Sequence, residues 1–123
     1  PQVTPLVIGI RREDPSRVWE RRVPLTPVDV KALPFPIHVH IQPSDKRVFR
    51  DREYEDGSGA EIKITEDLGE AHVVLGIKEV PVGELDVLEG KGVRMPGIPR
   101  TYMMFSHTAK GQEYNMPLLD RFL

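Results

Sequence analysis

The stretch His72-Val73-Val74-Leu75-Gly76-Ile77 is apolar apart from its first residue, and it runs directly into the charged pair Lys78-Glu79. A short, continuous apolar run is typical of a strand buried on both faces of a parallel sheet. The earlier run from Val3 to Ile10 has the same character and is rich in β-branched residues, which favour strands. Both stretches therefore predict buried strands of one sheet.

Helices separate the predicted strands. Thr26 can cap a helix and Pro27 suits its first position, so we expect a helix from Pro27 to Leu33, ended by Pro34. The alternating residues Ile37 to Ile41 then predict a strand with a period of two. The other predicted elements are a short helix around Asp51 to Glu55, a strand at Ala60 to Ile62, helical turns at Thr65 to Asp67 and Glu84 to Leu88, a loop at Lys91 to Pro99, a strand at Arg100 to Phe105 and a final helix from about Thr108 to Leu123.

Strands that alternate with helices indicate βαβ units. We therefore predict a single α/β domain, a doubly wound, mostly parallel sheet of about five strands with flanking helices. Ligands of such sheets bind at the carboxyl ends of the strands. Three polar clusters follow strands, and we expect them to converge on that edge: Arg11 to Arg22, Lys78-Glu79 and Ser106-His107.

The composition excludes several classes of protein. With 39% hydrophobic and 29% charged residues among 123, it is typical of one soluble globular domain. No apolar stretch approaches the ~20 residues of a membrane span, and no secretory signal is visible at the start. The net charge of -2 argues against a nucleic-acid-binding surface. The absence of cysteine excludes thiolate metal sites and cysteine nucleophiles.

Lys78 and His107 are the candidates for acid/base chemistry. Lys78 ends a buried strand, where partial loss of solvent favours a neutral amine that can act as a base; alternatively, it is a solvated lysine paired with Glu79. His107 follows a strand, and imidazole transfers protons near neutral pH; alternatively, it caps the next helix or packs locally. No two histidines have the helical spacing of a metal site, so we expect no metal.

Arg22 is the candidate for binding a carboxylate, because a planar guanidinium binds carboxylates bidentately. The alternative is a solvated cluster of charges, in which Glu13, Asp14 and Glu20 balance the arginines. The chain has no Gly-x-Gly-x-x-Gly fingerprint, no Walker motif and no Gly-x-Ser-x-Gly motif. None of its residues is therefore expected to bind a dinucleotide.

Four segments together resemble one family. They are Ile10 to Asp14 with Trp19 to Pro27, Ile41 to Ser44 with Arg47 to Phe49 and Tyr54, Val74 to Pro81, and Phe105 to Glu113. In this order they resemble the N-terminal domain of the alanine dehydrogenase and transhydrogenase superfamily. The nearest members are the lysine-ketoglutarate reductases (saccharopine dehydrogenases of the lysine-forming type), including the reductase part of bifunctional aminoadipic semialdehyde synthases. The stretch Asp86 to Pro99 is longer and more glycine-rich than the family suggests, and we interpret it as a loop insertion.

The resemblance implies an NAD(P)-dependent oxidoreductase that acts on CH–NH bonds. Such enzymes condense the ε-amine of lysine with 2-oxoglutarate and reduce the imine with hydride from NAD(P)H, which gives saccharopine. By the family's motifs, Lys78 and His107 would be the acid/base pair, Arg22 would bind a carboxylate, and Lys110 and Gln112 would lie at the substrate. A lysine and a histidine at neighbouring strand ends can hold different protonation states, which agrees with these roles.

Members of the family continue into a Rossmann domain, which binds NAD(P). We therefore expect residues 1–123 to be the substrate-binding domain of a longer enzyme, inactive alone, and the absence of an initial methionine supports this. The expected partners are lysine, 2-oxoglutarate, saccharopine and the missing domain, in the cytoplasm or the mitochondrial matrix, with no nucleic acid and no membrane. Two alternatives stay open: an alanine dehydrogenase- or transhydrogenase-like domain with another substrate, and a non-catalytic module of the same fold that binds a carboxylate.

Overall fold

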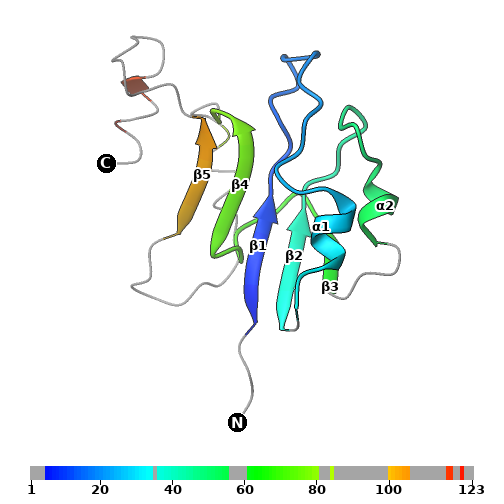
Figure 1. The fold of residues 1–123 in the computed structure, drawn as a ribbon. Coiled ribbons are helices and arrows are strands. Elements are labelled where there is room, and N and C mark those ends of the chain that lie inside the picture. Colours follow the sequence, from blue (N-terminus) through cyan, green and yellow to red (C-terminus); the bar gives the residue numbers. More distant parts are fainter. Residues whose placement is uncertain are drawn as a thin grey trace.

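The computed structural model describes residues 5–34, 36–55, 61–80, 84, 100–105, 116–117 and 120. These residues form one sheet of five parallel strands with two short helices (Figure 1). In chain order the elements are β1 (Leu6–Ile10), α1 (Pro27–Lys31), β2 (Ile37–Ile41), α2 (Asp51–Glu55), β3 (Glu61–Ile64), β4 (Val73–Lys78) and β5 (Thr101–Phe105). Within the described ranges, no helix has the length and apolar character needed to cross a membrane.

The order of strands in the sheet is β3-β2-β1-β4-β5, and each strand is parallel to its neighbours. After β1 the chain adds β2 and β3 on one side, and it then returns to add β4 and β5 on the other side. This reversal is that of a doubly wound sheet, so the predicted fold class is confirmed. In such sheets the ligand crevice opens at the carboxyl ends of the strands where the order reverses, which are β1 and β4 here.

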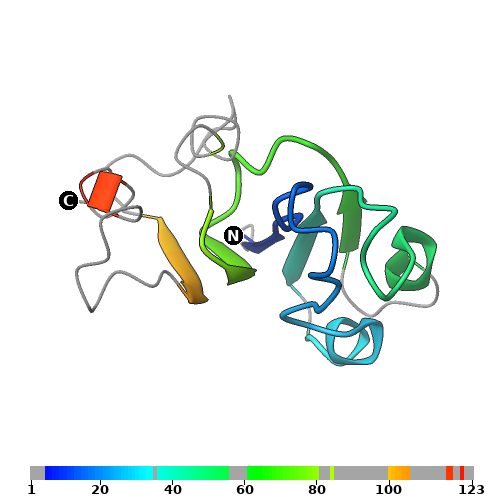
Figure 2. The same cartoon turned by 90° about the horizontal axis from the view of Figure 1, so that it is seen from above.

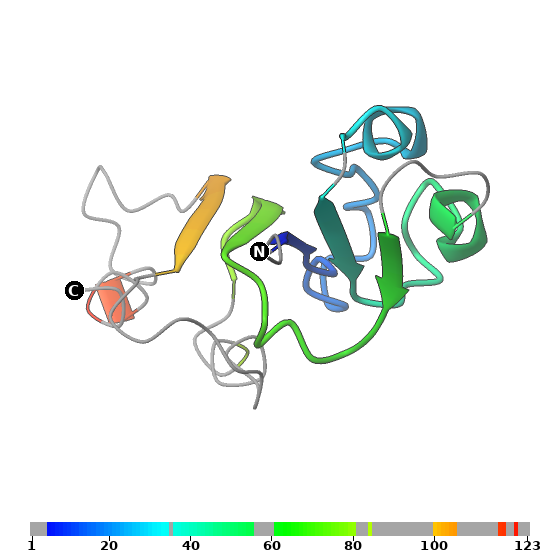
Figure 3. The same cartoon turned by 90° about the horizontal axis from the view of Figure 1, so that it is seen from below.

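Each face of the sheet has its own core. On one face α1 and α2 lie beside each other against β2 and β3, as the views in Figures 2 and 3 show. The core on this face consists of Ile10, Val30, Val39, Ile41 and Tyr54. The core on the opposite face consists of Val7, Leu68, Ala71, Val74 and Val80. Because successive residues of a strand serve opposite faces, both must be apolar, which explains the continuous apolar runs of β1 and β4.

Helix α1 begins as predicted and ends two residues early. The Thr26 hydroxyl accepts a hydrogen bond from the Asp29 backbone N–H at 3.2 Å, and the Asp29 carboxylate accepts from the Thr26 N–H at 3.0 Å. This reciprocal cap stabilises the first turn, which starts at Pro27. The helix ends at Lys31 rather than Leu33 because the chain must already turn toward Pro34 and β2.

The other predicted elements differ in how well they match. Helix α2 and strand β2 have the predicted bounds, and β3, β4 and β5 are displaced by one or two residues. The predicted helical turn at Thr65 to Asp67 is wrong, because the Thr65 hydroxyl instead accepts the Asp67 N–H at 3.2 Å in a local side-chain turn. The predicted loop at Lys91 to Pro99 and all but three residues of the predicted final helix lie outside the described residues.

His40 is a buried polar residue on the face of β2 opposite to Val39 and Ile41, and its Nδ1 atom is buried without a hydrogen-bond partner among the described residues. Burial lowers the pKa of His40, and the charges of Lys63 and His38 act in the same direction, whereas Glu70 and Asp67 oppose them. The unfolded chain therefore takes up this proton before the folded chain does.

We predict that His40 destabilises the fold on mild acidification. Its folded pKa lies below the ordinary value of about 6.5, so its effect is absent above that pH and grows as the pH falls below it. Replacing His40→Leu should flatten the decline of the unfolding free energy between about pH 7 and pH 5, measured by urea denaturation followed by circular dichroism. Val28→Leu, at an exposed position in α1 that does not titrate, is the control and should keep the wild-type slope. Equal slopes for the wild type and His40→Leu would contradict the prediction.

Candidate functional site

The loop after β1 is fastened to the end of β4 by one carboxylate. The buried side chain of Glu13 accepts the backbone N–H of Ile77 at 3.0 Å and that of Lys78 at 2.8 Å. A second link is the ion pair between Arg17 of the loop and Glu79. These contacts fix the backbone at Lys78 and hold the loop across the carboxyl ends of β1 and β4, the expected position of a ligand crevice.

Arg11 lies buried between these strands, with only 3% of its surface exposed. Its guanidinium lies so close to Gly76 that a Cβ atom at that position would overlap the Arg11 Nε atom. Burial lowers the pKa of Arg11, while the negative charges of Glu13 and Glu79 oppose this effect. The glycine in β4 thus leaves room for the Arg11 side chain, which follows the neighbouring strand β1.

Arg22 is held by Glu20. The carboxylate of Glu20 is 2% exposed, and it accepts hydrogen bonds from Arg22 Nε at 2.9 Å and Nη2 at 2.6 Å. The hydrogen bonds from Arg22, helped by the charge of Lys78, hold the pKa of Glu20 at about 2 although burial opposes them. The Arg22 side chain is 65% exposed, so its Nη1 group remains available to a further acceptor.

Arg22 and Lys78 line the same hollow, which we call the Lys78 hollow. Its volume is about 430 Å³, and its lining consists of Trp19, Glu20, Arg21, Arg22, Val48 and Lys78. The predicted convergence of the first two polar clusters on the carboxyl edge is therefore confirmed. The hollow joins three cations, a buried carboxylate and an exposed tryptophan, which together suit a small molecule with a carboxylate and an apolar part.

The third polar cluster cannot be placed. His107, Lys110 and Gln112 lie outside the described residues, so their predicted roles stay predictions. The described chain does reach the neighbourhood, because Phe105 at the end of β5 is the partner of Lys78 in the sheet register. Among the described residues, no group of three or more histidine, aspartate or glutamate side chains is arranged to hold a metal ion.

Sequence reasoning missed the roles of Glu13 and Glu20. It offered them only as charges that balance arginines in a solvated cluster, but both carboxylates are buried, as is Arg11. The solvated alternative for this segment is therefore wrong at these three residues. A weak signal existed in the spacing of Glu20 and Arg22, since residues two apart share one side of an extended segment.

The fold is that of a doubly wound α/β domain, and the comparisons with known proteins show the family to which it belongs. The family "Alanine dehydrogenase/PNT, N-terminal domain" matches residues 9–123, so the chain belongs to this family. The chain is 42% identical to the mitochondrial alpha-aminoadipic semialdehyde synthase of Bos taurus, 40% identical to that of Rattus norvegicus and 39% identical to the alpha-aminoadipic semialdehyde synthase of Arabidopsis thaliana. The resemblance of the four sequence segments is thereby confirmed.

These alignments cover 95% of the chain in each case. They cover 11% of the bovine and rat proteins and 10% of the Arabidopsis protein. The chain thus spans about a tenth of the length of the relatives it matches.

We predict that the pair of Glu20 and Arg22 stabilises the fold at neutral pH and loses this contribution in acid. The folded pKa of Glu20 is about 2 against an ordinary 4.5, so its contribution is present above pH 4.5 and is lost as the pH falls from there toward 2. Glu20→Gln should therefore lower the unfolding free energy at neutral pH and flatten its decline in that window, measured by urea denaturation. Glu55→Gln, at an exposed position in α2, is the control. A Glu20→Gln variant with the stability and acid slope of the wild type would refute the role of this pair.

Proposed function

We propose that this chain is the substrate-binding and acid/base domain of a lysine-ketoglutarate reductase, an oxidoreductase of lysine metabolism. The observation that supports this most is the Lys78 hollow, in which a loop arginine and a strand-end lysine lie at the switch point of the sheet. The relatives support it too, since alpha-aminoadipic semialdehyde synthases are the bifunctional enzymes whose reductase part the sequence resembles. The reaction joins the ε-amine of lysine to the keto carbon of 2-oxoglutarate and reduces the imine to saccharopine.

In this proposal the described residues bind substrate and move protons. The Nη1 group of Arg22 donates to a substrate carboxylate, while Glu20 orients the guanidinium through its other two donors. Lys78 Nζ takes a proton from the reacting amine, and Glu13 fixes the position of Lys78 by binding its backbone N–H. From the resemblance, His107 is the second acid/base group, and Lys110 and Gln112 contact the substrate.

The described residues do not fit a dinucleotide cofactor. The turn after β1, where a glycine-rich loop would admit a pyrophosphate, instead holds Arg11, Arg12 and Glu13. Arg11 and Glu13 are buried there, and Arg12 is bound to Glu66. We therefore propose that NAD(P)H is bound by a further domain of the full-length enzyme, and we derive no step through it in this chain.

We also propose that the enzyme lies inside the cell, in the cytoplasm or the mitochondrial matrix, since the bovine and rat relatives are named as mitochondrial.

The substrate is tested with the full-length enzyme by comparing the turnover of lysine plus 2-oxoglutarate with that of pyruvate plus ammonia. Turnover of the second pair alone would favour an alanine dehydrogenase-like domain instead.

We predict that Lys78→Met and His107→Gln each reduce kcat of the full-length enzyme by ~10²–10⁴, the usual scale of general acid–base catalysis. Each variant should also lose one limb of the pH–rate profile. Lys63→Met, at an exposed position in β3, is the control and should keep wild-type kcat. Arg22→Ala should mainly raise the KM for 2-oxoglutarate or lysine. If kcat falls less than tenfold in both Lys78→Met and His107→Gln, the acid/base roles are wrong and the domain is a non-catalytic binding module.

We also predict that the 123-residue chain alone binds NAD(P)H negligibly and shows no reductase turnover. Hydride transfer needs the nicotinamide within ~3–3.5 Å of the imine, and the described part of the chain offers neither a pyrophosphate turn nor a second wall for the cleft. Isothermal titration with NADPH and a coupled assay measure both properties, with the full-length enzyme as the positive control. Micromolar cofactor binding or measurable turnover would show that this division of labour is wrong.

A further inference from the structure

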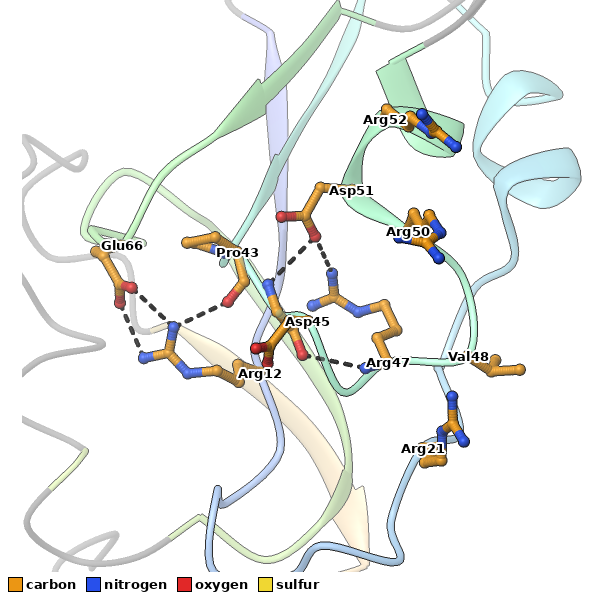
Figure 4. A pocket seen from close by; sticks show the side chains of 11 residues that line it. Arg12, Arg21, Pro43, Asp45, Arg47, Val48, Arg50, Asp51, Arg52 and Glu66 are labelled. Carbon is orange, nitrogen blue, oxygen red and sulfur yellow. Dashed lines mark hydrogen bonds and ion pairs between the residues drawn. The ribbon is translucent and has the colours of Figure 1, made fainter.

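A second and larger hollow lies next to the Lys78 hollow, and nothing in the proposed reaction uses it. Its volume is about 760 Å³, and five of the residues that line it are arginines, so we call it the arginine hollow (Figure 4). The loops after β1, β2 and β3 and the start of α2 surround it. The five arginines are Arg12, Arg21, Arg47, Arg50 and Arg52.

Two of these arginines serve the structure. Arg47 is buried, donates to the Gln42 carbonyl at 2.9 Å and the Asp51 carboxylate at 3.1 Å, and lies 5.7 Å from the centre of the Tyr54 ring. Arg12 donates two parallel hydrogen bonds to Glu66, at 2.7 and 2.9 Å. Figure 4 shows both held by dashed contacts. Both Nη groups of each arginine are engaged, and the contribution of the two side chains is to shape the hollow.

The other three arginines have donors to spare. Arg21 uses only Nε, which donates to the Lys46 carbonyl at 3.1 Å. The side chains of Arg50 and Arg52 are exposed and have no hydrogen bond or ion pair within the described part of the chain. Of the three carboxylates that line the hollow, Asp51 and Glu66 are paired with arginines, which leaves Asp45. The hollow thus has a local excess of positive charge, although the whole chain carries -2.

The two hollows share the wall formed by Arg21 and Val48, and they differ in their access to Arg22. The Val48 backbone N–H donates to the Arg21 carbonyl at 2.9 Å, which joins the loop after β2 to the loop that precedes α1. Arg21 and Val48 line both hollows, whereas Arg22 lines only the Lys78 hollow. Ligands of the two hollows would therefore lie side by side, and Arg22 would touch only one of them.

We propose that the arginine hollow binds a small molecule bearing phosphate groups, at a site separate from the substrate site. Three arginines with free donors line the hollow from two segments of the chain, Arg21 from one and Arg50 and Arg52 from the other. A tetrahedral phosphate directs its oxygens in several directions and can accept from both segments, whereas a carboxylate accepts in one plane. The volume is larger than one phosphate needs and is within the ~300–1,000 Å³ range of small-molecule sites.

The test is isothermal titration of the purified chain with pyrophosphate at fixed ionic strength. The double variant Arg50→Gln/Arg52→Gln should lower the affinity at least tenfold. The matched control Lys31→Gln/Lys63→Gln removes the same charge from exposed positions outside the hollow and should change the affinity less than twofold. Arg22→Gln should leave pyrophosphate binding unchanged, which separates this site from the proposed substrate site.

Three outcomes would overturn the proposal. Pyrophosphate fails to bind the wild-type chain, or the two double variants weaken binding equally, which would mean that only the overall charge matters. The third outcome is that succinate binds in an Arg50- and Arg52-dependent manner and pyrophosphate does not, which would make the ligand a dicarboxylate. Failure of the lysine-ketoglutarate reductase proposal would leave the predicted titrations unchanged, because none of them involves Lys78 or turnover.

Discussion

The carboxylate of Glu13 is the interaction on which the functional edge depends. It bridges the loop after β1 to the last two residues of β4 by accepting two backbone N–H groups. These two N–H groups lie at the irregularity in the pairing of β4 with β5, between Leu75 and Lys78. Because the regular pairing is interrupted there, they need a hydrogen-bond acceptor from another segment of the chain. Glu13 is that acceptor, and its two hydrogen bonds connect the carboxyl ends of β1 and β4 and fix the backbone at Lys78. A single buried acceptor thus connects the topology of the fold to the geometry of the site.

Buried charge is the second organising feature of this domain. Arg11, Glu13, Glu20, Arg47 and Glu79 are all buried, and each is compensated by a partner of opposite charge or by backbone groups. Isolated, such groups would be costly to bury, and removing one partner would leave the other uncompensated. Of these buried groups, Glu20 lines the Lys78 hollow and Arg47 lines the arginine hollow, while the arginines with unused donors indicate what the hollows can bind. Some arginines, such as Arg47, therefore serve the structure, whereas others, such as Arg50 and Arg52, have donors available for a ligand.

The sequence predicts the layout of this domain better than its electrostatics. Hydrophobic periodicity and helix capping depend on residues that are close in the chain. The bounds of β2 and α2 and the start of α1 could therefore be predicted from the local sequence. The turn at Thr65 was mistaken for a helix because a hydroxyl that caps a helix also closes a local turn. Convergence of Arg22 with Lys78 followed from the parallel sheet. The burial of Glu13 and Glu20 could not be foreseen, since a list of balanced charges does not show which of them lose water when distant segments pack.

Trp19 gives the domain an optical property of its own. It is the sole tryptophan of the chain, it is 69% exposed, and it lines the Lys78 hollow. An indole surrounded by water emits at longer wavelengths than a buried one, and all tryptophan emission of this chain arises at that single position. The fluorescence spectrum therefore reports on the hollow alone, without labelling and without background from the core. A molecule that enters the hollow and displaces water from the indole ring would shift the emission maximum of Trp19 to shorter wavelengths.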